Sequence, residues 1–213
     1  ITNACVSGRC SHRNPNMAQI PRVGQPYGAE CRGLFYAPHG WRQVGCDASG
    51  LELRGLGAQL AYFDGGEYAK LVSTEGFDIH THNAKLFGIY DGQGTIEKRI
   101  REQAKTLIYA VLYGAGAQKL GTILDPSLGQ YDQQDLGRET IETFYKNLPA
   151  IKKLKDKVDE RVLDRGFLIG IDGRHLQIRS RHSALNQLLQ STGSLCVKKA
   201  TCILYEDLKE NKL

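Results

Sequence analysis

The sequence predicts a mostly helical α/β (α+β) fold with a partial antiparallel sheet. Apolar residues recur at helical spacing through most of the chain. The clearest case is residues 96–113, whose apolar side is formed by Ala104, Leu107, Ile108, Val111 and Leu112. Two short runs around Asp172-Gly173 give a hairpin signal. With 213 residues, 41% of them hydrophobic, the chain can form one domain or two small ones.

The first 75 residues combine an irregular region with a strand and two helices. Residues 1–40 are rich in Gly, Pro, Asn and Arg, and we expect irregular structure with short strands there. Residues 41–48 are predicted to be a strand, followed by helices at 51–63 and 67–72. Asp47 is therefore expected at a strand-to-helix junction, facing an open cleft, although a helix N-cap is an equally good structural explanation.

The middle of the chain is predicted to be helical. Its central element is a helix over residues 96–113, which Gly114-Ala115-Gly116 ends after a turn at 90–94. This Gly-x-Gly is not a dinucleotide-binding fingerprint, because it ends a helix instead of opening one after a strand. Further helices are expected at residues 79–87, 118–124, 133–147 and 151–163. We interpret the charges of the last of these as a solvated face.

The last part of the chain is predicted to be a hairpin followed by a long helix. Residues 166–179 carry the two strands, and residues 182–208 carry a helical leucine pattern. The polar ending EDLKENKL contains no further signal.

Composition excludes several classes of protein. The net charge of +5 is mildly basic and compatible with nucleic acid. No apolar run approaches the roughly 18 residues of a membrane span, and no signal peptide is visible. The six cysteines form no CxxC pair and no zinc spacing, so we expect free thiols in a reducing, cytoplasmic compartment. Because Met17 is the only methionine, we expect the chain to begin inside a longer reading frame.

Four side chains make residues 101–114 the centre of the chain's chemistry. Arg101, Lys105, Tyr109 and Tyr113 follow one another at intervals of four, which drift by about 40° per step around a helix. Two cations followed by two rings suit a ligand with a polyanionic end and a flat end, such as a nucleoside triphosphate. The structural alternative is an amphipathic helix with a solvated polar side.

A second stretch, DASGLELR at residues 47–54, makes the pattern specific. Together with R-x3-K-x3-Y-x3-YG it resembles motifs A and B of the family A DNA polymerases, the DNA polymerase I family. The phrasing is most similar to that of the replicative polymerases of short-tailed bacteriophages. Supporting phrases run in one order from about Gly8 to Gly193: HRNPNMAQIPR, GWRQVGCDASGLELR, DIHT, KTLIYAVLYGAG and DGRHLQIRSRHSALNQLLQS.

The resemblance implies a right-hand polymerase architecture. Residues 1–75 would be part of the palm with motif A, and residues 76–165 the fingers with the motif B helix. Residues 166–213 would be a hairpin leading from fingers to palm and a long helix, truncated before motif C. The implied function is template-directed DNA synthesis, in which deoxynucleotides are transferred to a primer 3′-hydroxyl by two-metal catalysis.

The resemblance also assigns the metal site. Asp47 matches the metal aspartate of motif A, and the backbone carbonyl of Ala48 would add a second oxygen ligand. The implied cofactor is Mg²⁺, with two ions in the complete enzyme, because Mg²⁺ prefers hard oxygen ligands.

The nucleotide-binding residues carry over from the same motifs. Arg101, Lys105 and His80 are expected to bind the triphosphate, with Lys105 also protonating the pyrophosphate. For His80, which lies two residues from His82, a helix start capped by Asp78 is the structural alternative. Glu52 is expected to exclude a 2′-hydroxyl, Tyr109 to lie by the sugar and tolerate dideoxynucleotides, and Tyr113 and Gly114 to line the insertion site.

DNA contacts are implied at both ends of the chain. Arg9, Asn16, Gln19 and Arg32 match positions that face the duplex or the incoming nucleotide. Asn186 and Gln190 match residues that monitor the minor groove, and Arg174, with Arg179 and Arg181, is expected near the template strand. For these three arginines a solvated role is an even alternative.

One departure from the family limits the expected activity. The family's second metal aspartate lies in a His-Asp-Glu turn, which this sequence lacks. We therefore expect fingers and part of the palm, with negligible activity of the chain by itself. The expected partners are primer-template DNA, deoxynucleoside triphosphates and a complementary polymerase fragment or processivity factor, with no membrane. For a phage-encoded chain, the host cytoplasm is implied.

Two alternatives remain open at this stage. The chain is alternatively a non-catalytic DNA- or nucleotide-binding remnant, or half of a split polymerase. A single-subunit RNA polymerase relative is disfavoured, because such enzymes carry a smaller residue where this sequence has Glu52.

Overall fold

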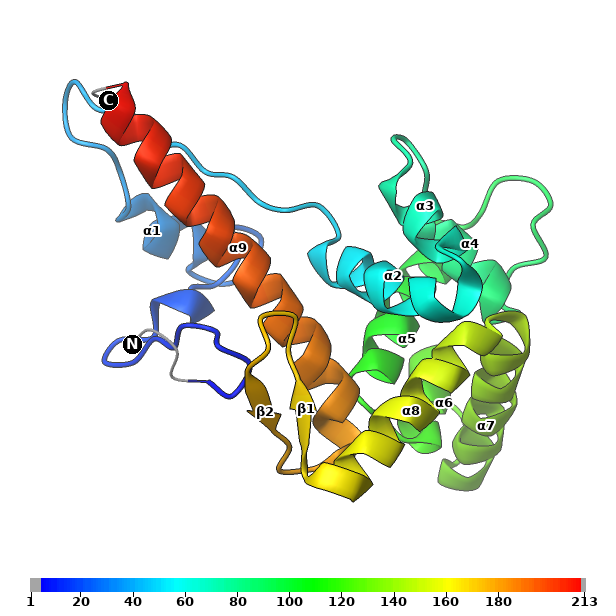
Figure 1. The fold of residues 1–213 in the computed structure, drawn as a ribbon. Helices are drawn as coiled ribbons and strands as arrows, with labels where there is room; N and C mark the ends of the chain where they lie inside the picture. Colours follow the sequence, from blue (N-terminus) through cyan, green and yellow to red (C-terminus); the bar gives the residue numbers. More distant parts are fainter. Residues whose placement is uncertain (1–4, 212–213) are drawn as a thin grey trace. The chain divides into compact units, whose positions relative to one another are not determined.

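The computed structural model describes residues 5–211, which fall into two compact units, Ile1–Ser49 and Gly50–Leu213. Figure 1 labels the helices and strands of both units. The predicted mostly helical fold with a small antiparallel sheet is confirmed. No described helix combines the length and apolar character that crossing a membrane requires.

The first unit is irregular and has little interior. It contains η1 (Met17–Gln19) and α1 (Gly28–Gly33), and among its described residues only Ser7, Gly8 and Gly28 are buried. The prediction of strands in residues 1–40 is wrong for the described part, and so is the strand at 41–48. A strand needs a hydrogen-bonded neighbour, and no described segment pairs with this one.

The second unit is built from helices that follow the predicted pattern closely. Helix α2 (Leu51–Asp64), α3 (Glu67–Ser73), α4 (Ile79–Leu86) and α5 (Lys98–Leu112) come first. They are followed by α6 (Ala117–Leu124), α7 (Gln130–Asn147) and α8 (Pro149–Arg165). The largest difference is in α7, which begins three residues earlier than predicted, while α5 begins two residues later and α8 is two residues longer at each end.

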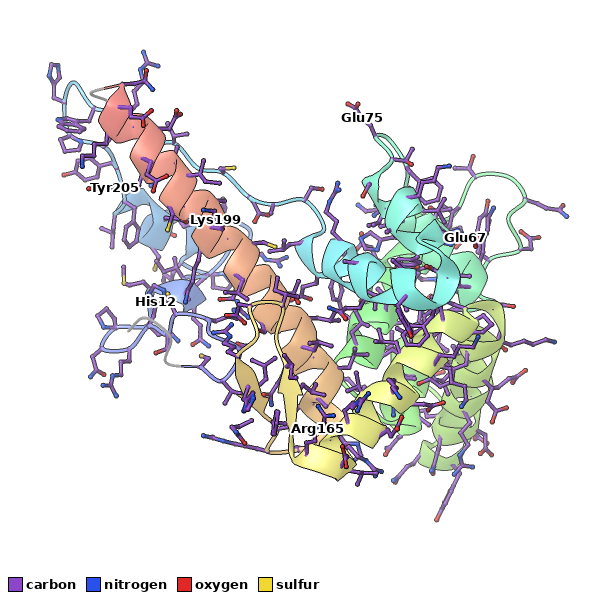
Figure 2. All side chains as sticks on the ribbon, viewed as in Figure 1. His12, Glu67, Glu75, Arg165, Lys199 and Tyr205 are labelled. Atoms are coloured by element: carbon purple, nitrogen blue, oxygen red, sulfur yellow. The ribbon has the colours of Figure 1, made fainter. Side chains whose placement is uncertain are left out.

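The hairpin and the last helix complete this unit. Strands β1 (Phe167–Ile169) and β2 (His175–Gln177) pair antiparallel, with Leu168 opposite Leu176. The turn η2 (Arg181–Ser183) then leads into α9 (Ala184–Glu210). Burial along α9 is confined to its first part, 184–193, while Lys199 and Tyr205 farther along are exposed (Figure 2).

The core of the second unit joins almost all its helices. Phe87 and Phe144 stack with ring centroids 4.2 Å apart, which joins the end of α4 to α7. The other large, fully buried side chains are Leu53, Leu56, Leu60, Tyr68, Leu107, Ile108, Leu112, Leu120, Ile151 and Leu176. Removing this apolar surface from water is the main stabilising contribution to the fold.

Helices α2 and α3 approach each other closely at Gly57. A Cβ added to Gly57 would lie 2.8 Å from the Cα of Ala69, whereas a Cβ on Gly55 would meet only a Thr192 methyl group at 3.8 Å. Both glycines are buried in α2, so they form a matched pair that differs in the space available.

We expect Gly57→Ala to destabilise the second unit by about 1–3 kcal/mol, because backbone must move to admit the methyl group. Gly55→Ala should be neutral or stabilising by up to about 1 kcal/mol, because alanine favours helix. Urea unfolding followed by circular dichroism measures both. Equal effects of the two substitutions would contradict the close approach of α2 and α3.

Candidate functional site

Helix α5 presents a polar row made of Arg101, Lys105, Tyr109 and Tyr113. The first three lie within the helix and Tyr113 is its C-cap, so the helical row predicted from the sequence is confirmed. Lys105 is exposed, the Arg101 side chain is 36% exposed and Tyr113 is 48% exposed. The rings of Tyr109 and Tyr113 are 6.2 Å apart between centroids. Cations therefore lie at one end of the row and rings at the other.

The row faces outward because the opposite side of α5 is fixed in the core. Ala104, Leu107 and Ile108 are fully buried. Gln103 adds a polar tie, because its Nε2 donates to the carbonyls of Ile123 and Leu124 at 3.1 and 2.9 Å. These are carbonyls at the C-terminal end of α6, which would otherwise lack partners.

At the cationic end, Asp78 holds Arg101 in a two-pronged ion pair. The Nε and Nη2 atoms of Arg101 donate to the two oxygens of Asp78 at 2.7 and 3.0 Å. The Asp78 carboxylate also accepts from the His80 backbone N–H, which caps α4 as the structural alternative predicted, and from the Thr81 hydroxyl. The Arg101 hydrogen bonds hold the pKa of Asp78 well below its usual range, and Asp78 in turn raises the pKa of Arg101.

His80 lies beside this pair. Partial burial lowers the pKa of its imidazole, and the charges of Arg101 and Lys105 lower it further. Its Nδ1 is buried and has no hydrogen-bond partner among the described residues. His80, Arg101 and Lys105 therefore form a cluster of nitrogen donors, to which α4 contributes the histidine and the first half of α5 the two cations.

At the aromatic end, Glu52 of α2 joins two other elements. The Tyr113 hydroxyl donates to the Glu52 carboxylate, with oxygen distances of 2.9 and 3.1 Å, and the Gln190 side-chain amide of α9 donates to it as well. Burial raises the pKa of Tyr109, and the negative charge of Glu52 adds to this effect. Glu52, Tyr109, Tyr113 and Gln190, which sequence reasoning singled out separately, are thus brought together.

Gly114 follows this cluster in a conformation that favours glycine. Its φ is +77°, and a Cβ there would lie 2.1 Å from the backbone oxygen of His182. The end of α5 therefore packs directly against η2, at the point where the chain turns toward α6.

The residues predicted to lie near DNA in the second unit differ in their hydrogen bonding within the protein. Arg174 is engaged in the protein itself, because its Nη2 donates to the Ser191 hydroxyl at 2.9 Å and its Nε lies 3.3 Å from Asp172. It thereby ties the hairpin to α9. Asn186 lies one helical turn before Gln190, and its Oδ1 is buried with no partner among the described residues.

The predicted site residues of the first unit are exposed. Asn16 caps η1 by accepting from the Ala18 N–H at 3.2 Å, and Gln19 ends that turn. Arg32 donates through Nε to the Pro21 carbonyl at 2.8 Å, which braces the loop before α1. Arg9, Asp47 and Ala48 lie in irregular segments. Asp47 does not cap α2, because Gly50 is the N-cap residue.

The described residues do not by themselves form a two-metal site. No group of three or more His, Cys, Asp or Glu residues in the described part of the chain is placed to hold a metal ion. The Asp47 carboxylate and the Ala48 carbonyl are oxygen ligands of the kind Mg²⁺ prefers, but two ligands cannot complete the coordination of two ions. The six cysteines, all described, are free.

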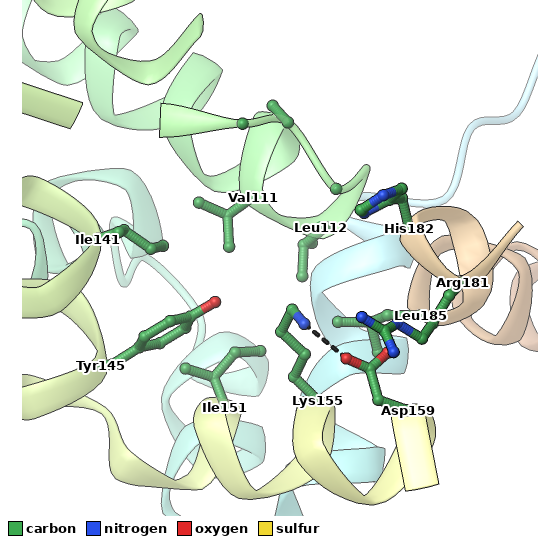
Figure 3. Close-up of a pocket in the computed structure, with 13 residues that line it drawn as sticks. Val111, Leu112, Ile141, Tyr145, Ile151, Lys155, Asp159, Arg181, His182 and Leu185 are labelled. Carbon is green, nitrogen blue, oxygen red and sulfur yellow. Dashed lines mark hydrogen bonds and ion pairs between the residues drawn. The ribbon is translucent and has the colours of Figure 1, made fainter. Parts of the chain in front are cut away.

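A pocket of about 210 Å³ lies behind the end of α5 (Figure 3). Its walls come from α5, the turn at 114–116, α7, α8 and η2, and it contains the Lys155–Asp159 ion pair of 2.8 Å. Val111 faces it, and this residue is two positions, about 200° around a helix, from Tyr109 and Tyr113. The pocket is therefore on the other side of α5 from the polar row.

Sequence reasoning missed the ion pair between Asp78 and Arg101. It interpreted Asp78 only as the cap of a helix start. The two partners are 23 positions apart, so no helical or strand periodicity links them. The sequence segment DIHT was the one indication that Asp78 matters, but it did not reveal Arg101 as its partner.

The fold is that of a polymerase domain. The POL domain of Pol1 from M. smegmatis, solved in complex with DNA primer-template and dNTP, matches 98% of this chain with a TM-score of 0.76 at 20% identity. This chain covers 37% of that structure.

The family model described as "DNA polymerase family A" matches residues 2–213 of this chain. The chain is 39% identical over 218 residues to the DNA-directed DNA polymerases of Enterobacteria phage T3 and Escherichia phage T7, with 92% of this chain covered in each case. It is 31% identical to the thermostable DNA polymerase I of Thermus aquaticus, with 97% of this chain and 25% of that protein covered. The chain belongs to DNA polymerase family A. It spans 29% of the length of the two phage relatives.

The pKa shifts of His80 and His82 predict how stability changes with pH. Burial lowers the pKa of both imidazoles below the usual 6.5, and Lys85 adds to the effect at His82. The unfolded chain therefore takes up protons first as the pH falls through 6.5, which favours unfolding. We expect the melting temperature to fall between pH 7.5 and 5.5.

The double substitution His80→Gln and His82→Gln should flatten this fall, while His182→Gln, at an exposed position, serves as the control. Differential scanning calorimetry across this pH range measures the slopes. An unchanged slope in the double variant would assign the pH dependence to other groups.

Proposed function

We propose that this chain forms the fingers and part of the palm of a template-directed DNA polymerase. In the proposed reaction, a deoxynucleotide from a deoxynucleoside triphosphate is transferred to a primer 3′-hydroxyl on primer-template DNA. The observation that carries the proposal is the ordered row on α5, with the His80 donor cluster at its start and Glu52 at its end. Family membership supports the same reaction class.

The cationic end is proposed to bind the triphosphate. Arg101 and Lys105 supply two positive charges, and a histidine held largely neutral at pH 7 can still donate from one nitrogen. Charge-assisted hydrogen bonds of this kind neutralise phosphate oxygens as charge builds on the leaving group. We assign to Lys105 the further role of protonating the pyrophosphate as it departs.

The aromatic end is proposed to receive the sugar and base. Hydrogen bonds from Tyr113 and Gln190 fix the Glu52 carboxylate. In that position it would clash sterically with the 2′-hydroxyl of a ribonucleotide. Tyr109, half-buried beside it, would lie against the sugar and accept dideoxynucleotides. Tyr113 and Gly114 would border the insertion site, where the ring stacks with the template base.

Selectivity is proposed to come from movement of α5 on correct pairing. The helix would move as a lid over the nucleotide. A correctly matched base pair would favour the closed position, in which the polar row of α5 contacts the nucleotide. This motion would use the glycine-containing turn at 114–116 as its hinge.

DNA binding is proposed to use both units. Arg9, Asn16, Gln19 and Arg32 would hold phosphates or groove edges of the duplex, and Arg174 would lie near the template strand. Asn186 and Gln190 would contact the minor groove, whose acceptors are common to all base pairs and so report geometry without sequence. Because those groove groups are acceptors, each of the two side chains would donate to them through its amide nitrogen.

The metal assignment stays a proposal based on the donor chemistry. Asp47 and Ala48 would hold part of the coordination shell of Mg²⁺, whose bound ions would activate the primer hydroxyl and neutralise the phosphates. The remaining ligands, including the family's second aspartate, would come from outside this sequence. The proposed location is the cytoplasm, with a complementary polymerase segment or processivity factor as further partners.

A non-catalytic module that binds DNA or nucleotide, or half of a split polymerase, is the second candidate. A relative of the single-subunit RNA polymerases is disfavoured by Glu52, as the sequence already indicated.

Primer extension separates these candidates. We expect no extension by the 213-residue chain alone on a primed template with Mg²⁺ and deoxynucleotides. Extension should appear when a segment that carries a His-Asp-Glu hairpin from a related polymerase is added. Duplex binding without extension in either case would favour the non-catalytic module, and extension by the chain alone would place the second metal ligand within it.

Lys105→Ala should weaken the binding of dTTP to the chain by about tenfold, because one charge-assisted contact to phosphate is lost. Lys146→Ala on α7 is the matched control, since it removes an exposed lysine outside the site. Isothermal titration calorimetry with dTTP and with thymidine measures the effect. Equal losses in the two variants would show that only net charge matters.

A further inference from the structure

We infer that Asp78 is a positioning residue of the triphosphate site, which orients Arg101 for phosphate and fixes His80 beside it. This inference rests on the proposed nucleotide-binding function. It assigns a role to an acidic side chain in a proposed anion site, where the negative charge by itself would repel a bound triphosphate.

The geometry of the ion pair leaves part of the guanidinium available. Asp78 takes the edge formed by Nε and Nη2, at 2.7 and 3.0 Å. The other edge contains Nη1, which makes a long, exposed contact of 3.4 Å with Glu102. Guanidinium has five N–H donors in a fixed plane, so fixing one edge also fixes the direction of the other.

The same carboxylate sets the position of His80. It accepts from the His80 backbone N–H at 3.2 Å and from the Thr81 hydroxyl at 2.6 Å, which anchors the first turn of α4. Asp78 therefore links the start of α4 to Arg101 on α5. One carboxylate thus holds the Arg101 guanidinium and the backbone from which the His80 side chain projects.

The pair can fix the orientation of Arg101 as well as contribute to stability. The side chains of Arg101 and Asp78 are 36% and 37% exposed, so solvent screens the attraction between their charges, but the two-pronged geometry still fixes the direction of the guanidinium. A flexible arginine, in contrast, must lose side-chain freedom when it binds phosphate, and a preorganised one avoids part of that loss.

Asp78→Asn separates orientation from charge. Asparagine is as good an N-cap as aspartate, so α4 should still begin correctly. Removing the negative charge should strengthen anion binding if only electrostatics matter. If orientation dominates, the binding of inorganic tripolyphosphate and of dTTP should instead weaken by about tenfold.

Glu102→Gln is the matched control. It removes the same charge from a residue that also contacts Arg101, but through the weak outer contact. We expect unchanged or tighter binding in this variant. Arg101→Lys keeps the positive charge but removes the planar guanidinium with its paired N–H donors. Its effect on triphosphate binding should not add to that of Asp78→Asn in a double-mutant cycle.

Calorimetric titration of the full chain with tripolyphosphate, dTTP and thymidine tests the inference, with circular dichroism to verify folding. Weaker triphosphate binding in Asp78→Asn alone, together with non-additivity, supports it. Equal or tighter binding in Asp78→Asn overturns the positioning role and leaves the proposed function intact. If the unsubstituted chain binds neither tripolyphosphate nor dTTP, the proposed nucleotide site fails, and the positioning role fails with it.

Discussion

The burial of the apolar side of α5 is the constraint on which the candidate site depends. Leu107 and Ile108 are fully excluded from solvent, and Leu112 is 1% exposed. Rotating the helix about its axis would expose these side chains, at about 1.5–3 kcal/mol for each large one. The polar row on the other side therefore has a fixed direction. Its direction follows from the packing of the opposite side of the helix, to which the half-buried Tyr109 of the row also contributes.

The two units differ in how firmly they can hold functional side chains. In the second unit, Glu52, Tyr113 and Gln190 project from three elements that share one core. The first unit buries almost nothing, and its Asp47 lies in an exposed, irregular segment. A catalytic carboxylate needs a rigid support to hold a metal ion in place. The core of the second unit thus supports the polar row of α5, whereas the described residues around Asp47 are exposed.

Most of the fold was predictable because its helices are marked locally, and most of the site's contacts were not. Helical periodicity and glycine stops, such as Gly114, are properties of a short segment. The prediction of a strand at 41–48 was wrong, because a strand forms only with a hydrogen-bonded neighbouring strand, which the local sequence does not reveal. The motifs identified the row and Glu52, but the bond from Gln190 to Glu52 joins residues 138 positions apart, and no spacing rule reaches that far.

The ion pair between Arg101 and Asp78 also bears on how the proposed polyanion site could be arranged before its ligand arrives. Arg101 and Lys105 lie one turn apart with His80 nearby, and like charges at that spacing repel. Asp78 offsets part of this repulsion, and its cost to phosphate binding is limited because it occupies only one edge of the guanidinium. In the described part of the chain, the carboxylate that contacts the other edge is that of Glu102, at 3.4 Å in a solvent-screened position. The resident carboxylate and the incoming anion can therefore share Arg101 instead of competing for it.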